Sequence, residues 1–244
     1  MIFFVGWHRP PHAYKFKRCM ISYNTIRNRV SDFPVNDWIM DSGAFTEVVK
    51  NGGYRASPED YAKDVVRWSQ CGNMLAAVSQ DFMCEDVAIR ATGLSIPVHQ
   101  EMTIERYDRI RANVPDYIHI MPVLQGYQPK EYVRHINMYG DRLKEGMWVG
   151  VGSVCKRNSS VSEIEDVLLA IRDKRGDLRI HGFGIKLTAL KSDFVWESLY
   201  SSDSMAWSYG ARVSGGDANC WNEALAYASR IESLDRQTTL IGEY

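Results

Sequence analysis

The sequence lacks three features that would indicate a membrane-bound or secreted protein: a long apolar run, a basic leader and a paired set of cysteines. The segment from Met1 to Gly6 is apolar but too short for a signal peptide, and no apolar run approaches the roughly 20 residues that span a bilayer. The five cysteines are odd in number and scattered, which fits reduced thiols rather than a disulfide framework. These absences predict a cytoplasmic protein without a membrane partner.

Strong charge of either sign is also absent. The net charge is −1 and the isoelectric point is about 6.6, so the overall charge does not indicate nucleic-acid binding. Basic residues gather locally instead. Such clusters neutralise phosphates, although they are also typical of a solvated surface. The candidates to contact a nucleic-acid backbone are Lys15, Lys17, Arg18, Lys156 and Arg157.

No Pro/Gly/Ser-rich linker divides the 244 residues, of which 45% are hydrophobic, so a single domain over residues 1–244 is expected. Short apolar runs alternate with longer amphipathic stretches, which is the pattern of repeated βα units around a parallel sheet. The predicted strands are Ile2–Val5, Trp38–Met40, Met74–Val78, Tyr117–Val123, Met147–Val151, Leu178–Phe183 and Leu199–Ser204. The predicted helices are Pro58–Trp68, Thr103–Ala112, Pro129–Tyr139, Ser162–Arg172 and Asn222–Ile231.

Seven or eight strands with helices between them favour a closed TIM-type (β/α)8 barrel. An open doubly wound sheet is less favoured because no dinucleotide-type glycine-rich turn follows an early strand. Polar and glycine-rich motifs follow the ends of successive predicted strands, where a barrel builds its site. These motifs are Asp41-Ser42-Gly43-Ala44-Phe45, Gln80-Asp81, Gln125-Gly126, Gly150-Val151-Gly152-Ser153, Gly182 to Lys186, and Asp203-Ser204.

Three carboxylates stand out among these motifs, namely Asp41, Asp81 and Asp203. Any one of them, taken singly, fits a turn or helix cap. Three at equivalent strand ends would repel one another in one barrel mouth, which favours a functional use.

The other residues at the strand ends allow both a structural and a functional interpretation. Gly150 and Gly152 permit sharp turns, and glycine also lets a flat ligand approach the backbone. The Gln125 amide offers a donor and an acceptor to a purine edge. Lys186 is either a solvated side chain or a partner for phosphate. Aromatic rings next to a strand end are often core residues, but they also stack on bases. The candidates for stacking are Phe45 and His181.

The ordered set of motifs resembles the tRNA-guanine transglycosylase superfamily. Residues 41–45 are similar to its Asp-Ser-Gly-Gly-aromatic motif, residues 123–126 to its Val-Gln-Gly segment, and residues 150–153 to its Gly-Gly-Leu-Ser loop. The closest resemblance is to the DNA-modifying DpdA family, from Phe3 to about Arg230. It is carried by Asp81 to Glu85 (DFMCE), Val149 to Arg157 (VGVGSVCKR), His181 to Lys186 (HGFGIK) and Asp203 to Arg212 (DSMAWSYGAR).

That resemblance implies a role for each candidate residue. Asp203 corresponds to the nucleophile, Asp41 to a general acid/base, and Asp81 with Gln125 to the grip on a guanine or deazaguanine edge. Phe45 corresponds to one stacking face and His181 to the opposite one, where the tRNA enzymes have methionine. Ser42 and the backbone at Gly150 and Gly152 complete the base-binding set.

The resemblance also implies the partners, which are DNA and a free 7-deazaguanine base. The tRNA enzymes carry a Cys-x-Cys-x-x-Cys and His zinc module near the C-terminus, whereas this region has only Cys220, so no metal and no cofactor are expected. The missing module favours DNA over tRNA, in a bacterial cell or a phage-infected host where such bases let DNA evade restriction. Guanine exchange in tRNA, a non-catalytic base-binding subunit, a homodimer and accessory modification proteins stay open as alternatives.

Overall fold

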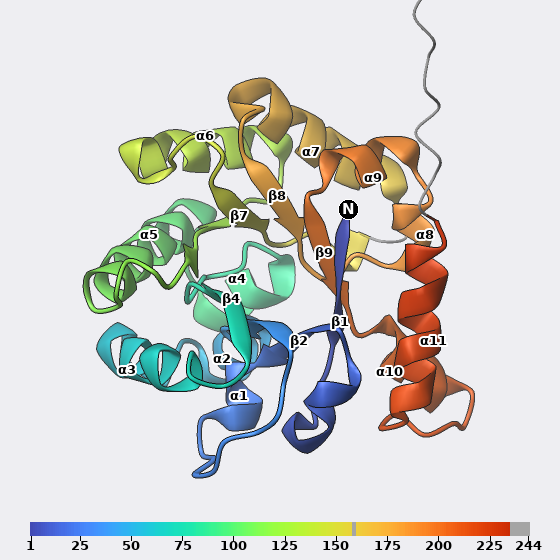
Figure 1. Cartoon of the computed structure of the whole chain (residues 1–244). Coiled ribbons are helices and arrows are strands. Elements are labelled where there is room, and N and C mark those ends of the chain that lie inside the picture. Colours follow the sequence, from blue (N-terminus) through green and yellow to red (C-terminus); the bar gives the residue numbers. More distant parts are fainter. Residues whose placement is uncertain (158–159, 235–244) are drawn as a thin grey trace, which may run out of the picture.

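The computed structural model describes residues 1–157 and 160–234, with the side chain of Lys156 left out. The described residues form nine parallel strands in a nearly closed barrel surrounded by helices (Figure 1). The strands are β1 (Ile2–Gly6), β2 (Arg18–Ser22), β3 (Asp37–Asp41), β4 (Asn73–Val78), β5 (Ile120–Met121), β6 (Val123–Leu124), β7 (Trp148–Val151), β8 (Arg179–Gly182) and β9 (Ser201–Ser204). The predicted TIM-type fold is confirmed.

The order of hydrogen-bonded strands is β5-β4-β3-β2-β1-β9-β8-β7-β6. Its two ends, β5 and β6, are separated only by Pro122, so together they act as one barrel strand with a break, and the nine strands become the eight of a (β/α)8 barrel. Proline lacks the N–H that a continuous ladder requires. The Pro122 carbonyl still accepts from the Gly150 N–H at 2.8 Å, which links this strand to β7.

The helices are α1 (Tyr23–Ile26), α2 (Ala44–Asn51), α3 (Pro58–Trp68), α4 (Asp86–Thr92), α5 (Ile96–Ala112), α6 (Pro129–Tyr139), α7 (Val161–Arg175), α8 (Leu187–Leu190), α9 (Asp193–Ser198), α10 (Ala206–Val213) and α11 (Trp221–Glu232). Three short 3-10 helices are η1 (Pro10–Lys15), η2 (Gly140–Arg142) and η3 (Cys155–Arg157). The five predicted helices are confirmed, two of them with the predicted ends.

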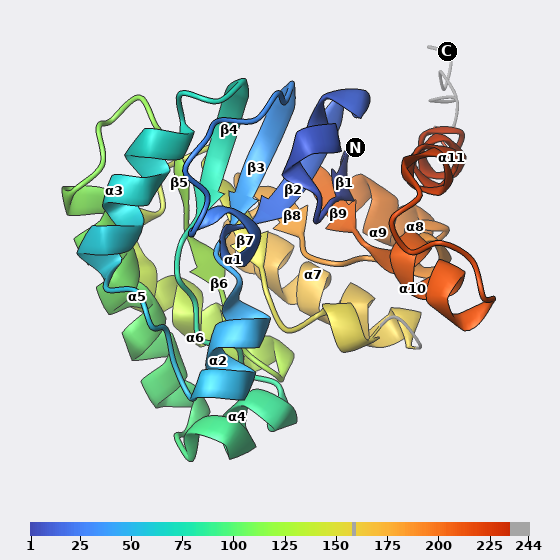
Figure 2. The same ribbon diagram turned by 90° about the horizontal axis from the view of Figure 1, so that it is seen from below.

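Local capping explains why α3 begins at the predicted residue. Ser57 Oγ accepts from the Asp60 N–H at 3.0 Å, and Pro58 occupies the first helical position, where its missing N–H costs nothing. Around the barrel, α3, α5, α6 and α7 pack outside the strands (Figure 1), whereas α2 and α4 lie beside each other beyond the carboxyl ends of the strands (Figure 2).

The alternation of side chains along each strand separates two apolar layers. Phe3 and Val5 of β1 point outwards and pack in the large cluster under the helices. Phe4 points inwards and joins Met20 and Ile39 in a smaller cluster that fills the barrel. Two residues further along, the inward positions of β2 and β3 are polar, so the apolar filling gives way to a polar layer at the carboxyl ends.

Candidate active site

A pocket of about 300 Å³ opens at the carboxyl ends of the strands. Its wall includes the carboxylates of Asp41, Asp81 and Asp203, from the ends of β3, β4 and β9, and the Gln125 amide that follows β6. Apolar side chains such as Met20, Val78 and Met83 make up much of the remaining lining. The structure therefore brings together the carboxylates that the sequence placed at strand ends.

Asp41 ends β3 and is half-buried. Burial, followed by the negative charge of Asp203, raises the pKa of Asp41 to about 6. Hydrogen bonds from the Gly43 N–H, at 3.1 Å to Oδ2, and from the Ser22 hydroxyl partly offset this effect. A carboxyl with such a pKa exchanges a proton readily near neutral pH, which is the property of a general acid/base.

Asp203 lies across the pocket on β9 and has different partners. Its Oδ1 accepts from the Gly184 N–H at 3.0 Å and lies 3.4 Å from His181 Nε2. Gly184 takes a φ of 63°, a conformation that glycine adopts without strain and that turns its N–H towards the carboxylate. Asp41 and Asp203 therefore have different environments, the usual basis for dividing acid/base and nucleophilic roles.

Asp81 is 5% exposed, and its two oxygens are both occupied. Gln125 Nε2 donates to Oδ2 at 2.5 Å, and Ser42 Oγ donates to Oδ1 at 3.3 Å. Burial is the main cause that raises the pKa of Asp81 to about 7, with the Gln125 amide acting against it and Asp41 adding to it. Ser42 is fully buried, does not line the pocket and holds Asp81 by this hydrogen bond.

The Gln125 amide is held from its other end by Ser153. Ser153 Oγ accepts from the Cys84 N–H at 2.9 Å and donates to Gln125 Oε1 at 2.8 Å, so the amide orientation is determined. Among the described residues Ser153 is the only non-glycine with a positive φ, 57°. Such conformations cluster at functional sites, where the surrounding contacts maintain them. Gly152 lies against the same amide and lines the pocket.

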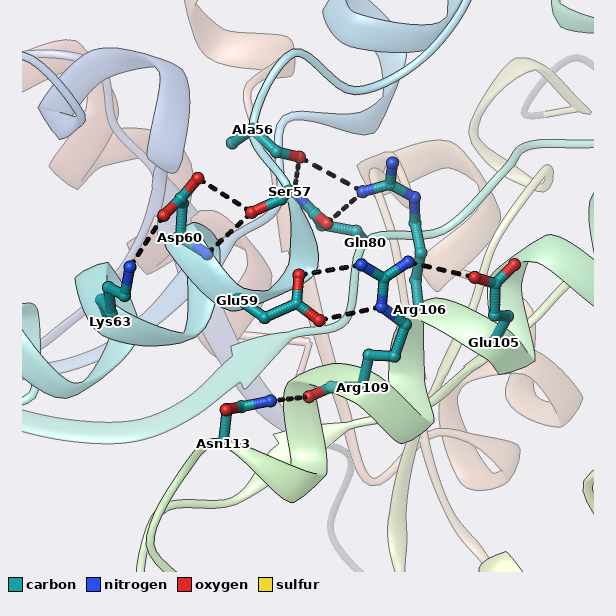
Figure 3. A network of polar contacts seen from close by, with 10 residues as sticks. All are labelled: Ala56, Ser57, Glu59, Asp60, Lys63, Gln80, Glu105, Arg106, Arg109 and Asn113. Carbon is teal, nitrogen blue, oxygen red and sulfur yellow. Dashed lines mark hydrogen bonds and ion pairs between the residues drawn. The ribbon is translucent and has the colours of Figure 1, made fainter.

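A second set of contacts holds the end of β4 from outside (Figure 3). Arg106 of α5 donates to Gln80 Oε1 at 2.5 Å and to the Ala56 carbonyl at 3.3 Å. The guanidinium also lies 5.0 Å from the ring centre of Tyr54, whose hydroxyl accepts from the Asp81 N–H at 2.9 Å. Gln80 therefore holds the segment after β4 that carries Asp81, and Arg106 links this segment to the loop before α3.

Phe45 and Phe183 are the phenylalanines of the pocket wall. Phe45 is 46% exposed and stands at the start of α2. His181 is fully buried and lies outside the pocket wall, with its ring centre 4.8 Å from that of Phe183. Gly150 also lies behind Phe183, where a Cβ atom would come within 2.4 Å of the ring. Neither His181 nor Gly150 lines the pocket.

The DpdA family, described as DeoxyPurine in DNA protein A, matches residues 3–234 of the chain. The chain belongs to the DpdA family. Membership confirms the resemblance and implies DNA modification with DNA as the substrate polymer, within a family similar to the tRNA-guanine transglycosylases. No curated protein matches the chain.

The predicted phosphate contacts of this DpdA chain fall in two places. Arg18 begins β2, and Asn36, just before β3, donates to the carbonyls that flank Lys15, so the cluster with Lys17 lies at the amino ends of the strands. All the strands are parallel, so their amino ends lie together at one end of the barrel, and the pocket lies at the other end, where the carboxyl ends meet. Lys15, Lys17 and Arg18 therefore lie away from the pocket, and their contact with DNA phosphates stays a prediction.

The other basic candidates lie on the pocket side. Lys186 is exposed and directly precedes α8, two residues after Gly184 of the pocket wall. Arg157 is 8% exposed, donates to the carbonyls of Ser153 and Tyr127, and supports the Ser153 loop from behind. The side chain of Lys156 lies outside the described residues.

The motifs did not reveal several residues of the site. Tyr54 and Ser22 hold Asp81 and Asp41 from loops and strand ends that carry no distinctive local pattern, and Met83 and Phe183 line the pocket. Within residues 1–157 and 160–234, no group of three or more His, Cys, Asp or Glu side chains is arranged to hold a metal ion. No helix in this part of the chain is long and apolar enough to cross a membrane.

Proposed function

We propose that the protein is a DNA-guanine transglycosylase that exchanges guanine in DNA for a 7-deazaguanine derivative through a covalent bond between Asp203 and deoxyribose. The observation that carries the proposal is the pair of carboxylates Asp41 and Asp203 in one pocket, where Asp41 has a raised pKa and Asp203 accepts from the Gly184 N–H and faces His181 Nε2. The family membership supports DNA as the polymer.

In the first step, Asp203 attacks the anomeric carbon C1′ of the target nucleotide. The bond from C1′ to the guanine nitrogen breaks, an ester bond from Asp203 to C1′ forms, and Asp41 gives its proton to the departing guanine. The ester conserves the reactivity of the glycosidic bond, as in retaining glycosidases. In the second step, a 7-deazaguanine enters, gives its proton to ionised Asp41 and attacks C1′, which releases Asp203.

The polar end of the pocket suits a guanine-like edge. Ionised Asp81 accepts from the N1–H and the exocyclic amino group, while the locked Gln125 amide offers an N–H towards the C6 carbonyl. Adenine presents an acceptor at N1 and a donor at C6, so it meets Asp81 and Gln125 with the wrong polarity. Recognition of 7-deazaguanine follows from the same edge, since the replaced atom is on the other ring.

The reaction also requires that water stay away from the ester. The methionines and phenylalanines of the pocket wall give the bound base an apolar surrounding, and Phe45 is placed for stacking. A target nucleotide in a duplex must be extruded from the stack, at a cost of a few kcal/mol. Both steps use only the carboxylates and the two bases, and we propose an exchange without cofactor or metal.

Exchange of labelled guanine into nucleic acid tests the proposal. The purified chain is incubated with labelled guanine and with either DNA or tRNA, and incorporation is measured after removal of free base. We expect incorporation into DNA, which a 7-deazaguanine competes away, and none with Asp203→Asn. Incorporation into tRNA alone would favour tRNA exchange, and no incorporation with either polymer by the purified chain would favour a binding subunit.

A further inference from the structure

We propose that His181 is a positioning residue for the nucleophile, the last donor in a chain of directed hydrogen bonds that runs from Trp148 through Ser201 to Asp203. This inference rests on the proposed function for its catalytic meaning, but the chain of hydrogen bonds is a property of the fold. It gives His181 a task other than stacking on the base.

Strand geometry brings the members together. Ser201 and Asp203 are two residues apart on β9, so their side chains share the inner face of the barrel. His181 pairs with Ser201 in the register between β8 and β9. Ser201 and His181 are fully buried, and the imidazole is enclosed by the rings of Phe4, Trp148 and Phe183 at centre distances of 6.2, 6.1 and 4.8 Å.

The direction of the chain follows from its first donor. The Trp148 indole N–H only donates, and it lies 2.8 Å from Ser201 Oγ, which must accept. The Ser201 proton is then available for His181 Nδ1 at 2.9 Å. His181 accepts at Nδ1, so it carries its own proton on Nε2, the nitrogen that faces Asp203 Oδ1 at 3.4 Å.

The other protonation states fit less well. With the proton on Nδ1 alone, a bare nitrogen would face a carboxylate oxygen. With a proton on Nδ1 in any form, Ser201 would receive two donors, and its own proton would find no acceptor among the hydrogen bonds of the described residues. A buried hydroxyl proton without an acceptor is costly. The neutral Nε2–H tautomer alone satisfies Trp148, Ser201 and Asp203 together.

The consequence is a difference between the two oxygens of Asp203. Oδ1 receives the His181 N–H and the Gly184 N–H, whereas Oδ2 accepts from no donor in the described part of the chain. Oδ2 is thus the oxygen that bonds to C1′ when the bond to guanine breaks. Oδ1 becomes the carbonyl oxygen of the ester and keeps both donors, which then stabilise the carboxylate again when the incoming base releases it.

Paired variants test the catalytic part. His181→Leu removes the donor, whereas His181→Gln offers an amide N–H close to the position of Nε2. We expect His181→Leu to lower kcat for guanine exchange by about 10-fold to 100-fold with KM for guanine within about twofold, and His181→Gln to recover most of the loss. His119→Phe is the control, because it keeps an aromatic ring against Trp148 and position 119 is not part of the hydrogen-bond chain. Unchanged kcat in His181→Leu, or a loss that appears mainly in KM, overturns the proposal.

A measurement without turnover tests the hydrogen-bond chain directly, so its result does not depend on the proposed function. Long-range ¹H–¹⁵N correlation spectra of histidine-labelled protein report which ring nitrogen carries the proton, and the His181→Gln spectrum identifies the signal. We expect the Nε2–H tautomer in the wild type and its partial loss in Ser201→Ala. A signal of the Nδ1–H tautomer, or of the doubly protonated ring, overturns the directed chain even if exchange activity is present. If the wild type shows the Nε2–H tautomer but no exchange, the proposed function fails and the directed hydrogen-bond chain is still supported.

Discussion

A Cβ atom at position 152 would lie 2.1 Å from the amide nitrogen of Gln125, so only glycine there leaves that amide in contact with Asp81. The φ of Gly152 lies outside the positive range, and the requirement is therefore for space rather than for an unusual backbone. The amide cannot move away without breaking its hydrogen bonds to Asp81 and Ser153. Gly152 and Gln125 thus form one unit of the base-binding wall.

Gly152→Ala is expected to raise KM for guanine by about tenfold or more, because the displaced Gln125 no longer offers its N–H to the base. The fold should survive, since the clash involves a side chain at the pocket edge. Guanine exchange kinetics and a thermal melt measure the two effects. Gly210→Ala in α10 is the control because a Cβ atom there meets nothing within 4 Å. An unchanged KM in Gly152→Ala would contradict the role of the amide.

Asp41→Asn is expected to stabilise the fold at neutral pH while it strongly slows exchange. Burial and the charge of Asp203 raise the pKa of Asp41 from 3.8 to about 6, so the folded state binds this proton more tightly than the unfolded chain. Stability therefore falls as the pH rises from about 4 to 6, and it stays reduced above that range. Urea unfolding at pH 8 should show a gain of about 3 kcal/mol that shrinks at pH 4.5. Asp173→Asn on the exposed surface of α7 serves as control, and a destabilised Asp41→Asn at pH 8 would contradict the raised pKa.

The pH dependence of kcat/KM for DNA is expected to be bell-shaped with its maximum between pH 6 and 7. Asp41 must hold its proton to protonate the departing guanine, and burial with the Asp203 charge raises its pKa to about 6. Asp81 must be ionised to accept from the base, and burial raises its pKa to about 7. The two limbs belong to the coupled pair rather than to single residues. A flat profile from pH 5 to 8 would show that these carboxyls do not limit the reaction.

Removal of positive charge is expected to weaken DNA binding only on the pocket side. Arg9 is exposed and follows His8 of the pocket wall, and Lys186 lies near Gly184. The double variant Arg9→Ala with Lys186→Ala should lower affinity and reduce the salt slope by about 1 for each phosphate that is no longer neutralised. The matched control is Lys17→Ala with Arg18→Ala, at the opposite end of the barrel. Equal weakening in both double variants would mean that DNA does not approach the carboxyl ends.

The strand ends were predictable because each apolar run stops at a polar or glycine-rich motif. Asp41, Asp81 and Asp203 thus met in one pocket as the pattern indicated. The break at Pro122 was hidden, since a proline inside an apolar run leaves the hydrophobic pattern intact. Strand β2 was not predicted because Arg18 belongs to a basic cluster, whose charge masks the short buried run that follows it.

Roles that depend on contacts across the barrel were beyond the sequence. His181 follows the alternation of β8 into the barrel interior, but only the register with Ser201 reveals that its ring faces Asp203. The hydroxyls of Ser153 and Tyr54 act through partners 28 and 27 residues away in the chain. Position along the chain does not indicate such pairs, because they form only when strands from separate βα units come together.

The most direct test of the proposed mechanism is the site of the covalent bond to DNA. The protein is incubated with a guanine-containing DNA strand in the absence of added base and is then denatured rapidly, and the adduct is digested and sequenced by mass spectrometry. We expect a deoxyribose remnant on the peptide that contains Asp203, none in Asp203→Asn, and slower formation in Asp41→Asn. An adduct on another residue, or exchange into DNA that continues in Asp203→Asn, would contradict the mechanism.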